Sequence, residues 1–313
     1  MIVVLSGGVG AARMLAGILA VVPADEVVAV VNTGDDTELH GLSISPDLDT
    51  ITYTLAGAVN PDTGWGLTGE TWSAMDALER YRGITWFRLG DRDLATHMYR
   101  TGRLAEGATL SEVTAEVTAA WGLGLRLLPM SDDPVRTRLR VAGIAGAGEE
   151  LAFQEYFVKL RHSVAVESVR FAGAEASKPA PGVLEAIAGA DAVVIAPSNP
   201  VVSIGPILAV PGVRDALVAR RDTVVAVSPI VGGAAIKGPA DRLLTELGFE
   251  SSVAGVARWH SDHAATIVVD EVDEPDAAKV EAEGMRCVVT KTVMRTPELA
   301  AELARVTIAA AHG

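Results

Sequence analysis

The sequence predicts an α/β protein: a Rossmann-like, mostly parallel sheet with helices on both faces and a largely helical insertion. Short apolar runs alternate with segments of helical periodicity through much of the chain, as in proteins built from strand–helix–strand units. Aromatic residues make up only 4% of the chain, while alanine, valine and glycine are abundant, which is typical of parallel sheets covered by helices. A chain of 313 residues can build one large core, and we expect residues 1–313 to form a single domain.

Charge and composition restrict the classes of protein to which this chain can belong. A net charge of −14 disfavours nucleic acid and anionic membranes as partners, because both are negatively charged themselves. The single cysteine, Cys287, allows no intramolecular disulfide and fits a reducing compartment. The first apolar run is too short for a signal peptide, and no stretch of about 18 uncharged apolar residues predicts a membrane span. We therefore expect a cytoplasmic protein that binds neither nucleic acid nor membrane.

The chain begins with a strand, a glycine loop and a helix. Residues 2–5 are an apolar run, SGGVGAAR follows, and helical periodicity extends over residues 14–22. Glycines let the backbone approach an anion, and the first turn of a helix offers N–H donors, so this loop can bind phosphate. It is not a dinucleotide fingerprint, because Arg13 stands at the third glycine position, and no Gly-Lys-Ser/Thr of a P-loop follows. A tight turn without a ligand is the alternative.

An acidic segment, residues 32–50, follows the buried strand predicted at residues 27–31. Ligands of open parallel sheets bind beyond the carboxyl ends of the strands, and Mg2+ prefers oxygen ligands that it shares with phosphates. We therefore predict a loop that binds Mg2+. One alternative is a solvated acidic loop held by Asx turns. Another is a nicotinamide-dependent dehydrogenase in which an aspartate holds a ribose. The acidic side chains are Asp35, Asp36, Glu38, Asp47 and Asp49.

Residues 55–172 interrupt the alternation of strands and helices and form the predicted insertion. The segment WFRLGDRDLATH within it contains Arg88, Asp91 and Arg92. Arginine can hold a phosphate or a carboxylate with two parallel hydrogen bonds, and salt bridges inside the segment are the alternative. The other elements that we expect are helices at 70–81 and over most of 101–123, a strand at 125–128, a helix N-cap or turn at 131–133 with Pro134 in the first helical position, a turn at 143–150 between antiparallel strands, a helix or strand at 151–158, and a strand within 161–172.

The α/β pattern returns at residue 181 and continues to the end of the chain. Two of its strands are followed by polar loops, PSNP with Ser198 and Asn199, and SPIVGG with Ser228 and Gly232. An asparagine amide both donates and accepts hydrogen bonds, which suits it to recognising a nucleobase. The expected elements are helices at 183–187, 213–219, 243–247 and 297–311, and strands at 192–196, 224–228, 253–257, 266–270 and 286–290.

Six motifs in this order resemble the 2-phospho-L-lactate transferase family, whose actinobacterial members act as phosphoenolpyruvate transferases. They are SGGVGA, ISPDLDT, RLGDRDLATH, LPMSDDPV, APSNPVVSIGPIL and AVSPIVGGAAIKGPA, and they span the chain from end to end. The resemblance implies a Mg2+-dependent enzyme of coenzyme F420 biosynthesis. Such an enzyme moves a phosphoenolpyruvyl or 2-phospholactyl group from a guanosine diphospho-adduct to the terminal ribityl hydroxyl of the deazaflavin Fo. GMP leaves, and dehydro-F420-0 or F420-0 is formed. The resemblance also suggests a homodimer.

The resemblance assigns roles to particular residues. Asp49 and Arg88 match the catalytic positions that hold Fo, and we group Asp91 and Arg92 with them. The metal would be held by Asp36, Asp47 and Asp49. Which of these carboxylates bind the metal and which bind Fo, and which of the two acyl groups is transferred, stay open. The expected nucleotide-binding residues are Gly7, Gly8, Gly10, Arg13, Ser198, Asn199, Ser228 and Gly232.

Two other functions are alternatives to the transferase. A related group of proteins with a similar fold regulates metabolism or cell shape by holding nucleotide-sugars without known turnover, and it shares the glycine loop and polar strand ends. RLGDRDLATH and LPMSDDPV favour the transferase over this binding module. A nicotinamide-dependent dehydrogenase is disfavoured by Arg13.

Overall fold

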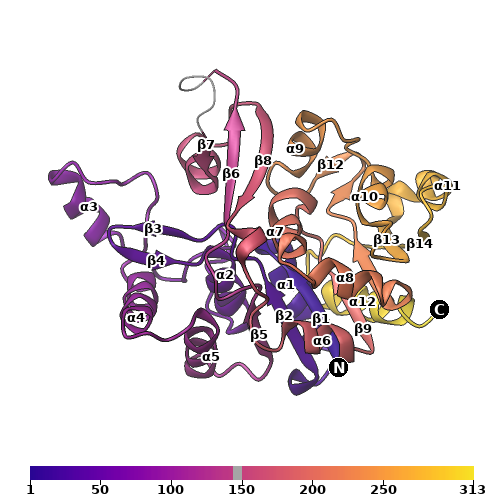
Figure 1. The fold of residues 1–313 in the computed structure, drawn as a ribbon, viewed down its shortest axis with the longest axis horizontal. Coiled ribbons are helices and arrows are strands. Elements are labelled where there is room, and N and C mark those ends of the chain that lie inside the picture. The colour runs from indigo at the N-terminus through magenta and orange to yellow at the C-terminus, as the bar shows by residue number, and fades with distance from the viewer. Residues whose placement is uncertain (144–149) are drawn as a thin grey trace.

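A computed structural model describes residues 1–143 and 150–313 and shows a central parallel sheet with helices packed around it (Figure 1). The predicted fold class is confirmed. The five inner strands of the sheet are short apolar runs buried on both faces, as expected where helices cover a sheet on both sides, and the two edge strands are partly exposed. The seven strands lie in the order β14 (Arg286–Thr290), β13 (Thr266–Asp270), β10 (Val224–Val227), β9 (Ala192–Ile195), β1 (Ile2–Ser6), β2 (Val27–Val31) and β5 (Arg126–Pro129).

The strand order reverses beside β1. β1 pairs in parallel with β2 on one side and with β9 on the other, and the chain reaches β9 only after passing through β5 and the insertion. Such a reversal opens a crevice at the carboxyl edge of the sheet, because the loops that follow the two neighbouring strands diverge. The glycine loop after β1, the acidic segment after β2 and the PSNP loop after β9 all begin at this edge.

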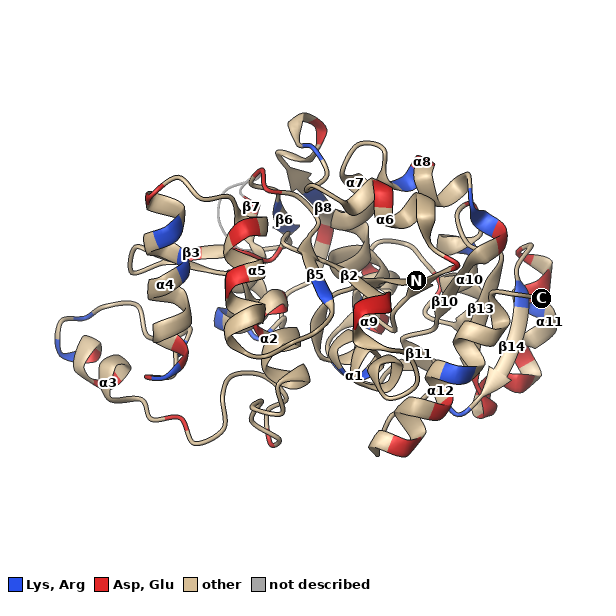
Figure 2. Ribbon diagram, turned by 90° about the horizontal axis from the view of Figure 1, so that it is seen from below, with Lys and Arg blue, Asp and Glu red and all other residues tan. Residues whose placement is uncertain are grey.

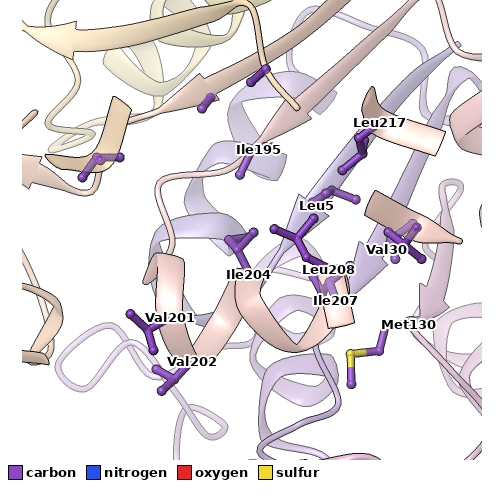
Figure 3. Packing of buried hydrophobic residues seen from close by; sticks show 14 of the residues in the cluster. Leu5, Val30, Met130, Ile195, Val201, Val202, Ile204, Ile207, Leu208 and Leu217 are labelled. Atoms are coloured by element: carbon purple, nitrogen blue, oxygen red, sulfur yellow. The ribbon is translucent and has the colours of Figure 1, made fainter. Parts of the chain in front are cut away.

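The core consists of two apolar layers, one on each face of the sheet. Alternation along β1 sends Val3 and Leu5 to one layer and Ile2 and Val4 to the other. Figure 3 shows Ile207 and Leu208 packed toward Leu5 and Val30 in the first layer. That layer is covered by α6 (Val183–Gly189), α7 (Gly205–Ala209), α8 (Val213–Val218), α9 (Ala240–Glu246) and α10 (Val253–His260), and the second by α1 (Gly8–Leu19), α2 (Pro46–Leu55) and α12 (Pro297–Ala310).

The helices of the inserted segment lie at one end of the molecule, opposite the strands β13 and β14, while its antiparallel sheet lies nearer the middle (Figures 1 and 2). Its helices are α3 (Ser73–Arg80), α4 (Asp93–Ala105) and α5 (Leu110–Ala120), and its antiparallel sheet has the order β7 (Glu150–Ala152), β6 (Arg136–Val141), β8 (Val166–Ala172). The turn expected at residues 143–150 falls mostly on residues 144–149, outside the described part of the chain. The remaining elements are the hairpins β3 (Thr37–Leu39) with β4 (Leu42–Ile44) and β11 (Ile230–Val231) with β12 (Ala234–Ala235), the helix α11 (Ala277–Ala282), and the 3₁₀ or π turns Ala24–Glu26, Glu155–Lys159, Ala174–Ala176, Pro200–Ile204, Arg221–Thr223 and Glu271–Asp276.

Two local expectations were wrong, and of the two alternatives for residues 131–133 only the turn was confirmed. Residues 253–257 are the start of helix α10 and not a strand, because Ser252 caps a helix there by accepting a hydrogen bond from Gly255 N–H at 3.0 Å. No described helix follows Pro134; the Ser131 hydroxyl instead accepts from Asp133 N–H at 3.0 Å in a turn that leads into β6. The acidic segment is not one loop, since it contains the β3–β4 hairpin and ends in helix α2, with Pro46 as its first residue.

No helix in the described part of the chain is both long and apolar enough to cross a membrane.

Candidate functional site

The glycine loop packs tightly against the loops beside it. A Cβ atom added at Gly7 would lie 2.7 Å from the Ser203 Cβ, and one added at Gly10 would lie 2.5 Å from the Pro197 carbonyl oxygen. Gly8 has a φ of +74°, a left-handed conformation that favours glycine. The Ser198 hydroxyl donates to the Gly7 carbonyl at 2.8 Å. The glycines therefore let the loop after β1 pack closely against the loop after β9, where the strand order of the sheet reverses.

Asp47 joins the glycine loop to the end of β2. Its carboxylate accepts hydrogen bonds from Gly8 N–H and from the Asn32 side-chain amide, both at 2.9 Å. It occupies the first turn of α2, where the positive end of the helix dipole favours an anion. Burial raises the pKa of Asp47 to about 6, against the effect of these two hydrogen bonds. Asp47 is therefore a buried carboxylate with no cationic partner among the described residues, and it lies beside the glycine loop.

Asp35 lies close enough to both Asp47 and Asp36 to interact with their charges. Burial, together with the negative charge of Asp47, raises the pKa of Asp35 well above its ordinary value. Burial raises the pKa of Asp36 to about 7, although Arg136, the Ser45 hydroxyl and Arg100 oppose the rise. Oδ1 of each of these two aspartates is buried and has no hydrogen-bond partner among the described residues. Such an oxygen-rich, anionic and incompletely paired set fits a hard divalent cation such as Mg2+.

Asp49 has a different environment, because it is paired with an arginine. Arg100 of α4 contacts both carboxylate oxygens of Asp49, with Nη1 at 3.1 Å from Oδ2 and Nη2 against Oδ1. His97 Nδ1 lies 3.6 Å from the same Oδ2, and His97 Nε2 lies 3.2 Å from Asp93 Oδ2. Tyr53 donates its hydroxyl to Asp93 at 2.6 Å. The cluster is buried, so its charges are screened little by solvent.

Asp49, Asp93 and His97 can also be considered as metal ligands. Their ligand atoms all lie within 4.8 Å of one another. The guanidinium of Arg100 already neutralises Asp49, and an imidazole is a poor ligand for Mg2+, which prefers oxygen. The trio is thus the group of described residues whose ligand atoms converge, while its ion pair and its imidazole suit Mg2+ poorly.

Sequence reasoning missed Arg100, Asp93 and His97 as parts of the site. Their spacing of four and then three residues places all three on one face of α4, facing α2. That periodicity was available in the sequence. The contact with Asp49 was not, because it joins residues 51 positions apart.

Arg88 makes its contacts with residues of its own segment and not with the Asp49 cluster. Arg88 pairs with Asp76 at 2.7 Å and lies over the ring of Trp72, 5.2 Å from its centroid, and both charged groups are exposed. Asp91 accepts from Ser73 and Ala74 N–H, at 2.9 and 3.0 Å, and so caps α3.

Hydrogen bonds hold the side chains of Asp91 and Arg92 in place. The hydrogen bond from the Thr71 hydroxyl has the largest effect on Asp91, and together with those from the start of α3 it lowers the pKa of Asp91 to about 2. Arg92 donates to the Thr68 carbonyl at 2.6 Å. The structure thus shows Asp91 and Arg92 organising the loop that carries Arg88.

The two polar loops of the second half also use part of their hydrogen-bonding capacity locally. The Asn199 side-chain oxygen accepts from Val201 and Val202 N–H, at 2.9 and 3.3 Å, and caps the following turn. Ser228 donates to the Ile230 carbonyl at 2.9 Å. Gly232 N–H donates to both carboxylate oxygens of Asp273 at 3.0 Å, a contact that the sequence did not suggest.

Two cations lie near the mouth of the glycine loop. Lys237 Nζ is 3.1 Å from the position of a Cβ added at Gly64, next to Val9 of the glycine loop. Burial and the charge of Arg13 lower the pKa of Lys237, so the two side chains repel each other across this opening. Elsewhere acidic and basic positions are interspersed over the surface helices (Figure 2). A cation pair in a chain of net charge −14 is suited to an anionic ligand.

Fold and site together define an α/β protein of Rossmann-like topology, with buried carboxylates where the strand order reverses and with a glycine loop and two cations close by. Comparison with known proteins agrees. Residues 2–305 match the family model described as 2-phospho-L-lactate transferase CofD. A phosphoenolpyruvate transferase of Kitasatospora aureofaciens is 48% identical over 314 residues, covering 99% of this chain and 98% of that protein. One of Mycolicibacterium smegmatis is 43% identical, covering 97% and 96%.

The chain belongs to the 2-phospho-L-lactate transferase family. Among solved structures, a member of the UPF0052 family from Bacillus halodurans has a TM-score of 0.64 at 16% identity, covering 98% of both chains. At this level of identity the likeness extends to the fold alone.

Proposed function

We propose that this chain transfers a phosphoenolpyruvyl or 2-phospholactyl group from a guanosine diphospho-adduct to the deazaflavin Fo, with release of GMP, in the synthesis of coenzyme F420. The observation that carries the proposal is the position of Asp47. Its buried carboxylate, next to Asp35 and Asp36, is hydrogen-bonded to the glycine loop that begins the family's motif series. A diphosphate over that loop and a cation on those carboxylates would lie side by side.

Mg2+ fits the carboxylates at the end of β2 and the start of α2. We assign Asp47 and Asp36 as its protein ligands, because neither has a cation within ion-pairing distance among the described residues and Asp36 Oδ1 lacks a hydrogen bond. Asp49 is the weaker ligand of the three, since Arg100 already neutralises it. The ion would neutralise charge on the phosphates as the bond to GMP breaks.

In the reaction, the acceptor hydroxyl attacks the phosphorus that bears the three-carbon group, and the bond from that phosphorus to the GMP oxygen breaks. The protein must place the hydroxyl in line with the leaving oxygen. Asp49, held rigidly by Arg100, offers unused lone pairs to accept a hydrogen bond from Fo. Arg88, whose ion pair with Asp76 is the only one it forms with the described residues and is exposed, can turn to the deazaflavin ring, while Asp91 and Arg92 fix its loop.

The guanosine diphosphate would lie between the two halves of the chain. Gly7, Gly8 and Gly10 would give the phosphates a close backbone surface, with the cations Arg13 and Lys237 at its edge. Ser198, Ser228 and Gly232 shape the adjacent loops through contacts within the protein. Asn199 keeps its amide N–H groups for the guanine, since only its oxygen is used as a cap.

Titration with Fo, followed by its fluorescence, tests this proposal. A transferase should bind Fo, and binding should tighten when GDP and Mg2+ are present. A protein that binds a nucleotide-sugar but leaves Fo fluorescence unchanged would instead be a binding module. Sedimentation of the pure protein checks the homodimer that we propose from the resemblance.

A further inference from the structure

A cavity of about 210 Å3 adjoins the Asp49–Arg100 pair, on the side toward β5 and β6. Arg100 forms part of its wall, so the cavity and the buried ion pair share a side chain. Its volume is several times the roughly 30 Å3 that a water molecule takes in the liquid. The cavity can therefore hold a small organic group. Its polar lining is Thr33, Asp36, Thr37, Glu38, Ser43, Ser45, Arg100, Asp132, Asp133 and Arg136.

The wall contains polar atoms that lack partners in the described chain. Thr33 is only 1% exposed, and its hydroxyl has no hydrogen bond to the described residues. Asp36 Oδ1 is likewise buried and unpaired. The great majority of buried polar groups in folded proteins are hydrogen-bonded, and an unpaired one is costly. The Thr33 hydroxyl is therefore a donor available to a bound group, whereas Asp36 Oδ1 can only accept and belongs to the metal ligand proposed above.

The two cations of the cavity are in different states. Arg100 is engaged by both oxygens of Asp49. Arg136, the first residue of β6, donates from Nη1 to its neighbour Val135 at 2.9 Å and forms no ion pair with the described residues. A guanidinium has five N–H groups in a fork that matches a carboxylate, so most of the donors of Arg136 are available to a ligand.

We propose that this cavity receives the carboxylate of the transferred three-carbon group, and that Arg136 is the residue that recognises it. The inference rests on the proposed function and deepens it. An enolpyruvyl or lactyl group carries a carboxylate next to its phosphate ester. Four acidic residues line the cavity, Asp36, Glu38, Asp132 and Asp133, and they would repel that anion unless a cation met it. Arg136 supplies the cation, and the Thr33 hydroxyl can donate a further hydrogen bond. The protein would thus recognise the guanosine adduct at two places, its guanine and its carboxylate.

Equilibrium binding of two ligands to parent and variant separates this role from phosphate binding. The guanosine adduct carries the carboxylate and GDP does not. Arg136→Gln should weaken binding of the adduct, and raise its KM, by about 10- to 100-fold, the range that charge-assisted hydrogen bonds span. Binding of GDP and of Fo should change by less than about twofold, which also reports that the variant is folded. Arg136→Lys keeps the charge without the fork and should lose less than Arg136→Gln.

Arg138→Gln is the matched control. It lies two residues along the same face of β6 but outside the cavity wall, so it should leave binding of both ligands unchanged. Equal weakening of the adduct and GDP in Arg136→Gln would place Arg136 on the phosphates and overturn the inference. Unchanged adduct affinity would overturn it as well. A parent protein that neither binds Fo nor prefers the adduct to GDP would refute the proposed function itself, whereas an active parent with an insensitive Arg136 refutes only this inference.

Discussion

Arg100 of α4 holds Asp49, at the first turn of α2, through both of its terminal guanidinium nitrogens. This contact fastens the inserted helices to the α/β core at the point where the crevice opens. Arg100 is 3% exposed and lies within 4 Å of Asp49, so neither charge is accessible to solvent when the pair is intact. The pair therefore combines a structural role with the placement of a carboxylate proposed to hold Fo.

Removing the arginine should be costly. Arg100→Met leaves Asp49 buried without its partner, and we expect the free energy of unfolding to fall by about 3–5 kcal/mol. Arg103→Met is the matched control on the same helix, because Arg103 forms partly exposed ion pairs with Glu106 and Glu116, which solvent screens and which contribute little to stability. Urea denaturation measures both. A similar small fall in the free energy of unfolding of the two variants would show that the buried pair does not stabilise the contact between the inserted helices and the core.

Arg88 is proposed to bind the acceptor and not the donor. Lysine keeps the charge of Arg88 but loses the planar fork, so Arg88→Lys should raise the KM for Fo about 10-fold and change that of the guanosine donor little. The exposed pair with Asp76 should not prevent recruitment, because such pairs stabilise proteins by about 1 kcal/mol or less. Steady-state kinetics with each substrate varied in turn gives both constants. An equal rise in the two KM values would place Arg88 on the phosphates.

Asn199 can be tested with a variant that separates its two roles. Asn199→Asp keeps an oxygen to accept from Val201 and Val202 N–H but removes the amide donors proposed to face the guanine O6. We expect it to weaken GDP about 10-fold while ADP binding changes little. Asn199→Ala should lose the same preference and, in addition, about 1 kcal/mol of stability with the cap. Calorimetry with both nucleotides decides, and a preference for GDP that survives in Asn199→Asp would show that the amide does not read the base.

The pH dependence of stability should contain a contribution from two buried histidines. His260 Nδ1 lies 3.0 Å from His263 Nε2, and burial lowers the pKa of both below the ordinary value, well below it for His260. The unfolded chain then binds protons more readily than the folded one, so stability falls as pH drops below about 6.5. His260→Gln should reduce this slope. Urea midpoints at pH 5 and pH 7.5 measure it, and a slope unchanged by the substitution would exclude this origin.

Much of the fold could be predicted because its signals are local. Apolar runs such as VVAVV and AVVI predict the buried strands directly, and the glycine loop predicts the turn that follows the first strand. Where the local signal is ambiguous, prediction failed. The apolar run at residues 253–257 suits a strand or a helix equally, and the serine cap at Ser252 decides for the helix. Likewise, Pro46 begins a helix, which moves Asp47 and Asp49 from a loop to a rigid first turn.

The site could be predicted only in outline. The position of Asp36 and Asp47 in the segment after a buried strand predicted that both lie at the carboxyl edge of the sheet, because parallel strands end at that edge together. Arg100 looks like an ordinary surface residue of a helix, and only the packing of α4 on α2 buries it against Asp49. The cavity beside Arg136 is also a product of tertiary packing, since its walls come from the segment after β2, the β3–β4 hairpin, α4, the start of α5 and residues 132–136.

The most direct test of the account is a turnover experiment with Fo, the guanosine adduct and Mg2+, read by mass spectrometry. We expect Fo to gain one phosphoenolpyruvyl or phospholactyl group for each GMP released, and the product mass to distinguish the two by two hydrogens. Chelation of the metal should abolish the reaction, and Asp49→Asn should lower its rate by about 100-fold or more while the protein stays folded. GMP release without modification of Fo, or full activity in Asp49→Asn, would contradict the account.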